Sequence, residues 1–193
     1  MKSKINLLFI LFFSVLFFAS CSDERPGQIE KIRNSENSNR EKINEIADIS
    51  LKCITCGESK ITFQTISDNE FFIYLEYYDK DFLFESTEQM QEIVKENIAK
   101  SVWRILHDTK DLGLEGITVS YFGDIMGELR YPIIQLTGER KNLEGISGFY
   151  TVDPYDTDDY DIIPAGSEQE KIIKEVVKKL KTDLDNTPNI EFK

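Results

Sequence analysis

The chain has few of the residue types that build metal and nucleophile sites. Its 193 residues include one histidine, His107, and three cysteines. A zinc site needs about four such ligands, and His107 lies far along the chain from all three cysteines, so a zinc centre is not expected. The sequence also lacks a glycine-rich phosphate loop, a GxSxG nucleophile elbow and an HExxH metal motif. We therefore expect no cofactor, no catalytic residue that a motif would identify and, on balance, no enzyme.

Basic residues are scarce as well. The chain has 23 Lys and Arg residues against 35 Asp and Glu, a net charge of −12 at pH 7. No local cluster of lysines and arginines offsets this excess. Because a strongly acidic protein repels phosphate backbones, binding to nucleic acid is not expected.

Long hydrophobic runs are absent, with one exception. Leu7 to Ala19 is thirteen residues long, is interrupted only by Ser14, and follows Lys2 and Lys4. A membrane-spanning helix needs about 20 residues, whereas a secretory signal peptide has an apolar segment of roughly 7–15 behind a basic start. The sequence therefore predicts a signal peptide over residues 1–20 and no span elsewhere.

The end of this run carries a second signal, Phe18-Ala19-Ser20-Cys21. It resembles the lipobox of bacterial lipoproteins, although Phe18 stands where that pattern usually has Leu. The resemblance implies cleavage before Cys21, a thioether-linked lipid on its sulfur, and acylation of the new amine. Two or more acyl chains anchor a protein stably to a membrane. Cleavage removes 20 residues, two of them lysines and none acidic, which leaves 173 residues with a net charge of −14.

The tripeptide Ser22-Asp23-Glu24 follows the cysteine. It resembles the acidic export tag of Bacteroidota-type lipoproteins, which implies an outer-membrane protein displayed at the cell surface. The polar residues 21–39 contain too few apolar side chains to offset the entropy of ordering them. We interpret 21–39 as a flexible tether that turns helical near Glu36, and 40–193 as a single domain.

Periodicity predicts an α+β domain. We expect two layers, with a mainly antiparallel sheet of about five strands and two or three helices on one of its faces. Pro132 is expected at a sheet edge or a bulge. The expected elements are a short strand over 49–53, a hairpin over 61–78 whose second strand is central, a helix from Ser86 to Asp108, strands over 117–122 and 129–137, and a helix from Ser167 that contains Leu180 and Leu184 and stops at Asn186.

Cys53 and Cys56 form a CxxC motif. A thioredoxin-like dithiol begins a helix, whereas Gly57 and an expected strand follow here. Exported proteins meet an oxidising environment, so a local disulfide is the favoured interpretation. Free buried thiols and a redox role are the alternatives.

The segment from Asp153 to Asp161 is a candidate calcium site. Calcium takes several oxygen ligands from loops, and this one offers the carboxylates of Asp153, Asp156, Asp158, Asp159 and Asp161. The spacing does not match an EF-hand, so a solvated acidic loop is the favoured alternative. The loop also has aromatic residues that could stack on a glycan or contact a protein: Tyr150, Tyr155 and Tyr160.

Two further sets of residues have side chains suited to catalysis but do not belong to a known motif. His107 could serve as a general base, yet a histidine at the end of a helix is also favoured by the helix dipole. Glu76, Glu85 and Glu88 surround the link between the hairpin and the long helix. Paired carboxylates hydrolyse glycosides only at a defined separation in a cleft, which a sequence does not show.

The sequence thus favours a non-enzymatic, lipid-anchored envelope protein that binds a protein or glycan partner at the outer membrane. A small hydrolase, or a redox accessory that uses Cys53 and Cys56, is one alternative. An immunity or inhibitor lipoprotein with an acidic face is another.

Overall fold

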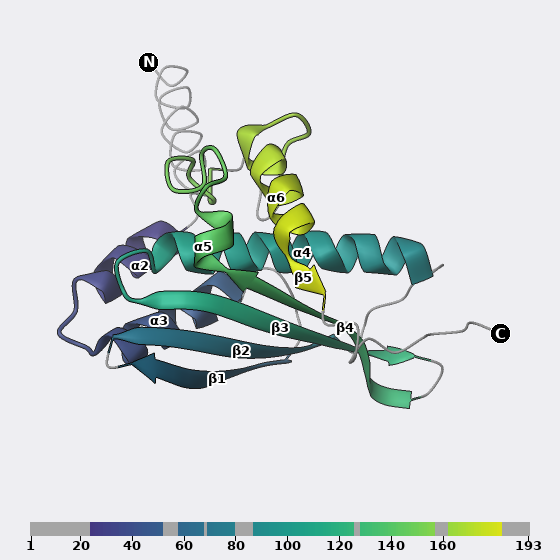
Figure 1. The fold of residues 1–193 in the computed structure, drawn as a ribbon, viewed down its shortest axis with the longest axis horizontal. Helices are drawn as coiled ribbons and strands as arrows, with labels where there is room; N and C mark the ends of the chain where they lie inside the picture. The colour runs from purple at the N-terminus through teal and green to yellow at the C-terminus, as the bar shows by residue number, and fades with distance from the viewer. Residues whose placement is uncertain are drawn as a thin grey trace, which may run out of the picture.

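The computed structural model describes residues 24–51, 58–67, 69–79, 87–125, 128–156 and 162–182. These residues form an α+β domain (Figure 1). In the described part of the chain, no helix combines the length and apolarity needed to cross a membrane. The helices are α2 (Arg25–Arg33), α3 (Asn39–Leu51), α4 (Thr87–Asp108), α5 (Arg140–Leu143) and α6 (Glu168–Lys179), and the strands are β1 (Glu58–Ser67), β2 (Glu70–Asp79), β3 (Leu114–Ile125), β4 (Glu128–Glu139) and β5 (Lys181–Thr182).

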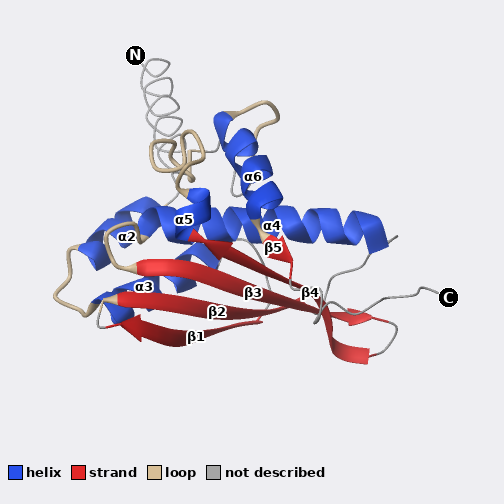
Figure 2. Ribbon diagram, in the orientation of Figure 1, coloured by secondary structure: helices blue, strands red, loops and turns tan. Residues whose placement is uncertain are grey.

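The five strands form one mixed sheet in the order β1-β2-β3-β4-β5 (Figure 2). Three of its pairings are antiparallel, as the sequence predicts, but β2 and β3 run parallel. Parallel neighbours need a long crossover connection, and α4 supplies it. The expected hairpin is β1–β2, and β2 is central because β1 and β3 flank it.

One face of the sheet is buried under the helices, which lie together on that side (Figure 2). Along β2, Ile73, Leu75 and Tyr77 are buried while Tyr74 between them is 42% exposed. Alternate residues of a strand point to opposite faces, so the first three face the helices. The sheet is therefore amphipathic, with an apolar side and an open side.

The long helix α4 forms the centre of the core, as its apolar spacing predicts. Val94, Ile98 and Val102 are at most 2% exposed, and Trp103 is fully buried. The indole nitrogen of Trp103 donates a hydrogen bond to the carbonyl of Phe149, at 2.9 Å. This bond fastens the loop after α5 to the helix layer. Truncation of a buried tryptophan to alanine costs about 3–5 kcal/mol of stability.

Part of the segment 21–39, which the sequence predicts to be a tether, is helical in the described chain. Residues 25–33 form α2, which packs against α3. Ile29 is 5% exposed and belongs to the hydrophobic core. A single well-placed isoleucine thus docks a helix that is otherwise polar, because the surrounding fold supplies the apolar surface.

The prediction of a short strand over 49–53 is wrong at its start, because Ile49 and Leu51 belong to α3. Apolar residues at alternate positions also fit a helix when buried neighbours precede them. Ile43, Ile46 and Ala47 are fully buried on α3, and their packing extends the helix through the alternating residues.

Pro132 occurs where the sequence predicts. Tyr121 pairs with Ile134 and Phe122 pairs with Pro132, so Ile133 is the extra residue of a bulge. On the other side of β4, β5 pairs only with Leu136 and Thr137. Pro132, which has no amide hydrogen, therefore lies both beside a bulge and on an edge that no described strand covers.

The helix α6 starts as predicted and ends early. Ser167 accepts a hydrogen bond from the amide of Glu170 at 3.1 Å, which is the expected N-cap. The helix ends at Lys179, because Leu180 is extended with φ −63° and ψ 133° and leads into β5. The predicted continuation through Leu180 is therefore wrong. Leu184 and the stop at Asn186 lie outside the described residues.

Candidate functional site

A cleft opens where α2, the end of α4 and the loop after α5 meet. Its volume is about 550 Å³. Apolar side chains of Pro26 and Ile29 line one part, and the polar lining includes His107, Asp108 and Asp153. Among the described residues this is the cleft with a histidine and carboxylates together, so it is the candidate for chemistry.

His107 and Asp108 form a hydrogen-bonded pair at the end of α4. The ring Nδ1 of His107 lies 2.8 Å from Oδ1 of Asp108. An ionised carboxylate only accepts, so the proton in this bond belongs to Nδ1. The His107 side chain is 21% exposed at the cleft. The hydrogen bond to Asp108 therefore fixes the orientation of the imidazole beside the cleft.

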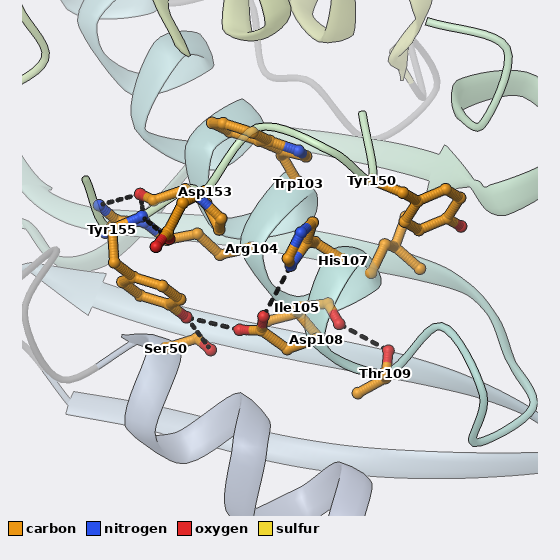
Figure 3. Close-up of polar contacts among 12 residues, drawn as sticks. Ser50, Trp103, Arg104, Ile105, His107, Asp108, Thr109, Tyr150, Asp153 and Tyr155 are labelled. Atoms are coloured by element: carbon orange, nitrogen blue, oxygen red, sulfur yellow. Dashed lines mark hydrogen bonds and ion pairs between the residues drawn. The ribbon is translucent and has the colours of Figure 1, made fainter. Parts of the chain in front are cut away.

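The second oxygen of Asp108 is also engaged. Oδ2 accepts a hydrogen bond from the hydroxyl of Tyr155 at 2.6 Å. That hydroxyl lies 3.2 Å from Oγ of Ser50 on α3. Figure 3 shows that hydrogen bonds join His107 to Asp108 and Asp108 to Tyr155 across the space between α4 and the loop. The chain of contacts ties three separate segments together.

Tyr155 acts in this network as a permanent donor. Its side chain is buried. Burial, and then the charge of the Asp108 carboxylate, raise the pKa of the Tyr155 hydroxyl well above its ordinary value. The hydroxyl therefore keeps its proton at neutral pH. Two guanidinium groups lie near its ring centroid, that of Arg25 at 4.9 Å and that of Arg104 at 5.0 Å.

Arg104 is fully buried although it lies in the middle of α4. Its Nε and Nη2 both donate to the carbonyl of Pro154, at 3.2 Å. A buried guanidinium needs such acceptors, because an unpaired buried charge is very unfavourable. Arg104 therefore positions the loop that carries Asp153 and Tyr155 (Figure 3).

A second buried arginine closes the end of α4. Arg140 donates to the carbonyls of Leu106 at 3.0 Å, Thr109 at 3.2 Å and Leu114 at 2.6 Å. It also donates to the hydroxyl of Tyr150 at 2.5 Å. A cation at a helix C-terminus interacts favourably with the helix dipole and the last carbonyls. Arg140 thus caps α4 next to the cleft.

The structure places the predicted aromatic residues in this framework. Tyr150 is half-buried and accepts from Arg140. Tyr155 is 6% exposed, and its ring lies close to the two arginines described above. Tyr160 lies outside the described residues. Both described rings have a packing role, and a binding role for the three stays a prediction.

The acidic loop is described only in part. Oδ1 of Asp153 accepts from the amide of Tyr155 at 2.8 Å, and the carbonyl of Asp156 accepts from Gln169 at 2.9 Å. Within the described ranges, no three His, Cys, Asp or Glu side chains gather as a metal site. The calcium site stays a prediction, since three of its members lie outside the described residues: Asp158, Asp159 and Asp161.

Several predicted residues lie outside the described part of the chain. These are the three cysteines, Cys21, Cys53 and Cys56, together with Glu85 and the side chain of Glu88. Glu76 is described. It is exposed on the open side of the sheet and lies 3.9 Å from Lys60 of the neighbouring strand. Glu76 therefore belongs to a different surface from the His107 cleft.

Sequence reasoning missed the contacts that organise the cleft. Ser50 and Tyr155 are 105 residues apart, and no local pattern joins them. One signal was present in the sequence: Arg104 lies between Trp103 and Ile105 in the middle of the apolar helix. A charged residue within such a stretch indicates a buried, bonded group.

The open side of the sheet is the second candidate region. The hydroxyl of Tyr74 donates to Oε1 of Gln64 at 2.9 Å, and the hydroxyls of Thr118 and Thr137 lie 2.8 Å apart. The ring of Phe72 covers Gly116 so closely that a Cβ atom there would come within 2.4 Å of it. No described helix lies on this side (Figure 2). The surface combines aromatic rings with hydroxyl and amide groups.

Comparison of the chain with protein-family models, with curated proteins and with solved structures finds no match. The contacts of the two candidate regions are therefore the basis for a functional assignment. In the cleft, the polar groups bond mainly to one another. On the sheet, one face has no described helix over it, and the outer side of β1 has no described strand beside it.

Proposed function

We propose that this chain is a lipid-anchored envelope protein whose mature domain binds another protein and does not catalyse a reaction. One observation carries the proposal. In the described part of the chain, helices cover one side of the five-stranded sheet, and the other side presents Phe72 and Tyr74 among polar groups. Aromatic side chains beside polar groups are enriched at protein interfaces.

The attachment to the membrane is proposed from the sequence. The apolar run and the Phe18 to Cys21 signal support a lipid on Cys21, and the acids that follow support surface display on the outer membrane. Changing Cys21 to Ala is expected to move the protein from the membrane fraction to the soluble fraction. Continued extraction by detergent alone would contradict the anchor.

The state of the cleft supports binding over catalysis. Both carboxylate oxygens of Asp108 are used within the protein, one by His107 and one by Tyr155. Tyr155 stays protonated, and Arg104 is bonded to the backbone. Asp108, Tyr155 and Arg104 thus hold parts of the fold together, and chemistry at the cleft would depend on His107.

The test is to capture partners from the envelope with the full lipidated protein and to map the contact by hydrogen exchange. We expect amides of the sheet to become protected, and we expect capture to be unchanged by His107→Asn. Protection confined to the cleft, or the absence of any captured protein, would overturn the proposal.

A second candidate is a small hydrolase, because the His107–Asp108 pair borders a cleft of about 550 Å³. In this role Asp108 would orient the ring, and Nε2 would take a proton from an attacking water. Turnover of a simple ester such as p-nitrophenyl acetate that is lost in His107→Asn would support it. Equal turnover by the two proteins would exclude it.

A further inference from the structure

The strand β1 is an open edge of the sheet. It pairs with β2 along one side, and no described strand pairs with its other side. Every second residue of such a strand directs its N–H and C=O groups outward, where they can pair with another chain. An edge of this kind is a template for strand addition.

Most protective features of edge strands are missing from β1. Natural edges are commonly protected by proline, by charged residues or by bulges. The ten residues of β1 include no proline, and only Glu58 and Lys60 are charged. The pairing with β2 is regular from Glu58 to Thr65 and shifts only before Ser67. Eight residues of this nearly uncharged edge are therefore in regular register with β2 and have no described strand on their other side.

The side chains of β1 are also incompletely covered. Ile61 and Phe63 pack against the core but are only half-buried. Ile66 is 54% exposed. An added strand would cover this apolar surface, and burial of apolar area is the main favourable term in association.

A groove runs beside this edge, between α3 and β1. Its volume is about 490 Å³. The β1 side provides Ile61 and Phe63, and the α3 side provides Arg40, Asn44 and Glu45. A strand added at the edge would direct alternate side chains toward the groove, which is how strand-addition sites obtain specificity. The groove gives the edge a place to recognise side chains.

The charge of the groove points to the kind of partner. Glu41 and Glu45 both line it. Hydrogen bonds from the hydroxyl and the amide of Ser38 lower the pKa of Glu41, so that carboxylate stays charged. The guanidinium of Arg40 lies over the ring of Phe63, 5.4 Å from its centroid. The acids therefore face solvent, while the one lining arginine is held against an aromatic ring.

A second copy of this chain is a poor occupant for the same reason. The chain has a net charge of −12, and the predicted mature form is more acidic still. Two acidic chains would repel each other as their β1 edges approached, whereas a basic segment would be attracted to the acidic protein. The favoured occupant is thus basic and extended.

We propose that β1 and the α3 groove bind an extended protein segment in which apolar residues alternate with lysine or arginine. The segment adds as a strand to the edge of β1 and points its basic side chains into the groove, so its apolar side chains lie on the opposite side of the sheet. In the groove, the aliphatic stems of the basic residues cover Ile61 and Phe63 and their charged ends reach Glu41 and Glu45. This inference rests on the proposed binding function and names its site and the chemistry of its partner.

The first test uses a synthetic ten-residue peptide of alternating valine and lysine, with a valine–glutamate peptide as its matched control. We expect the lysine peptide to bind about tenfold more tightly, a difference of roughly 1.4 kcal/mol, and to bind more weakly at high salt. Hydrogen exchange should slow at alternate amides of β1. Equal binding of both peptides, or binding without protection of β1, would overturn the proposal.

The second test changes the groove without changing the core. Asn44 is exposed on α3, so Asn44→Trp fills the groove and is expected to weaken binding of the lysine peptide about tenfold. Glu45→Lys should weaken it severalfold. Glu144→Lys makes the same charge change at the end of α5, outside the groove, and should leave binding nearly unchanged. Unfolding midpoints confirm that each variant is folded.

The outcomes separate this inference from the broader proposal. Capture of an envelope partner that is undiminished by Asn44→Trp would overturn the β1 site and leave the binding function standing. A dimer in sedimentation, together with β1 amides protected in hydrogen exchange, would identify a second copy as the occupant. That result would overturn the proposal of a basic segment. Failure to capture any partner would overturn the binding function itself.

Discussion

The end of α4 and the edge of β1 use polar groups in opposite ways. At the end of α4, Arg140 and Asp108 each bond to several partners within the protein. At β1, a row of main-chain groups has no described partner on its outer side. The first region has more charged side chains, but its bonds are made. The second has few charges and an open hydrogen-bonding edge.

This difference teaches that chemically rich residues do not by themselves mark a binding surface. Buried polar groups are satisfied in folded proteins because leaving them unpaired is costly. A dense set of polar groups that are hydrogen-bonded to one another therefore indicates a structural role. An open backbone edge beside a groove indicates a place where another molecule can supply the missing partners.

The largest expected effect is at the end of α4. Arg140→Met should lower the free energy of unfolding by about 3 kcal/mol or more, because buried carbonyls of three residues lose their donor. Urea unfolding measures the change. Lys171→Met, at an exposed lysine of α6, is the control and should change it little. A loss below 1 kcal/mol would mean that the bonds at the end of α4 contribute little, contrary to the contrast drawn with β1.

A smaller loss is expected for Tyr155→Phe, which removes the hydroxyl that donates to Asp108. A hydrogen bond to a charged group is worth about 1.5–3 kcal/mol, and thermal unfolding measures its loss. Tyr74→Phe removes an exposed hydroxyl on the open side of the sheet and should change stability by less than about 0.5 kcal/mol. Similar losses at both positions would show that the two regions do not differ.

A pH-dependent effect is expected at Glu139, beside the cap of α4. Hydrogen bonds from Lys141 and Lys181 lower the pKa of Glu139 to about 2. A carboxyl with a lowered pKa stabilises the fold above its unfolded pKa, near 4.3, and loses that contribution as the pH falls toward 2.

The test compares Glu139→Gln with the parent protein. The variant should be less stable by under about 1 kcal/mol at pH 7, because both lysines are exposed, and the gap should narrow at pH 3. Glu175→Gln on α6 is the control. A gap that is constant with pH would contradict the role of the charge.

The smallest effect is expected at the edge. Ile66 is 54% exposed, so Ile66→Thr should change the free energy of unfolding by less than about 0.5 kcal/mol. The same change should weaken binding of the basic peptide. A loss of stability above 1 kcal/mol would mean that Ile66 is already covered in the free protein, and the edge would no longer be open.

Much of the fold could be predicted because its signals are local. The β1–β2 hairpin, the apolar stripe of α4 and the N-cap at Ser167 each depend on residues within a few positions of one another. The helix α2 was missed because its burial depends on distant contacts, such as Arg25 over the ring of Tyr155. The order strand, helix, strand around α4 was a signal for the parallel pairing, since a crossover of that length joins parallel neighbours.

The site was less predictable than the fold. His107 and Asp108 are adjacent in the sequence, so their pairing could be expected. Their connection to Tyr155 and Ser50 depends on how α3, α4 and the loop meet in space. The edge of β1 depends on the order of the strands in the sheet, which periodicity does not determine.

With the proposed lipid on Cys21, the helix α2 would set how high the domain can stand above a bilayer. Three residues, Ser22 to Glu24, separate Cys21 from the first residue of α2. An extended chain covers at most about 3.3–3.6 Å per residue, so four residue steps reach roughly 14 Å. Because Ile29 fastens α2 to the core, a lipid on Cys21 would hold the whole domain against the headgroups. The protein would then meet its partners at the membrane surface itself, not at a distance across the envelope.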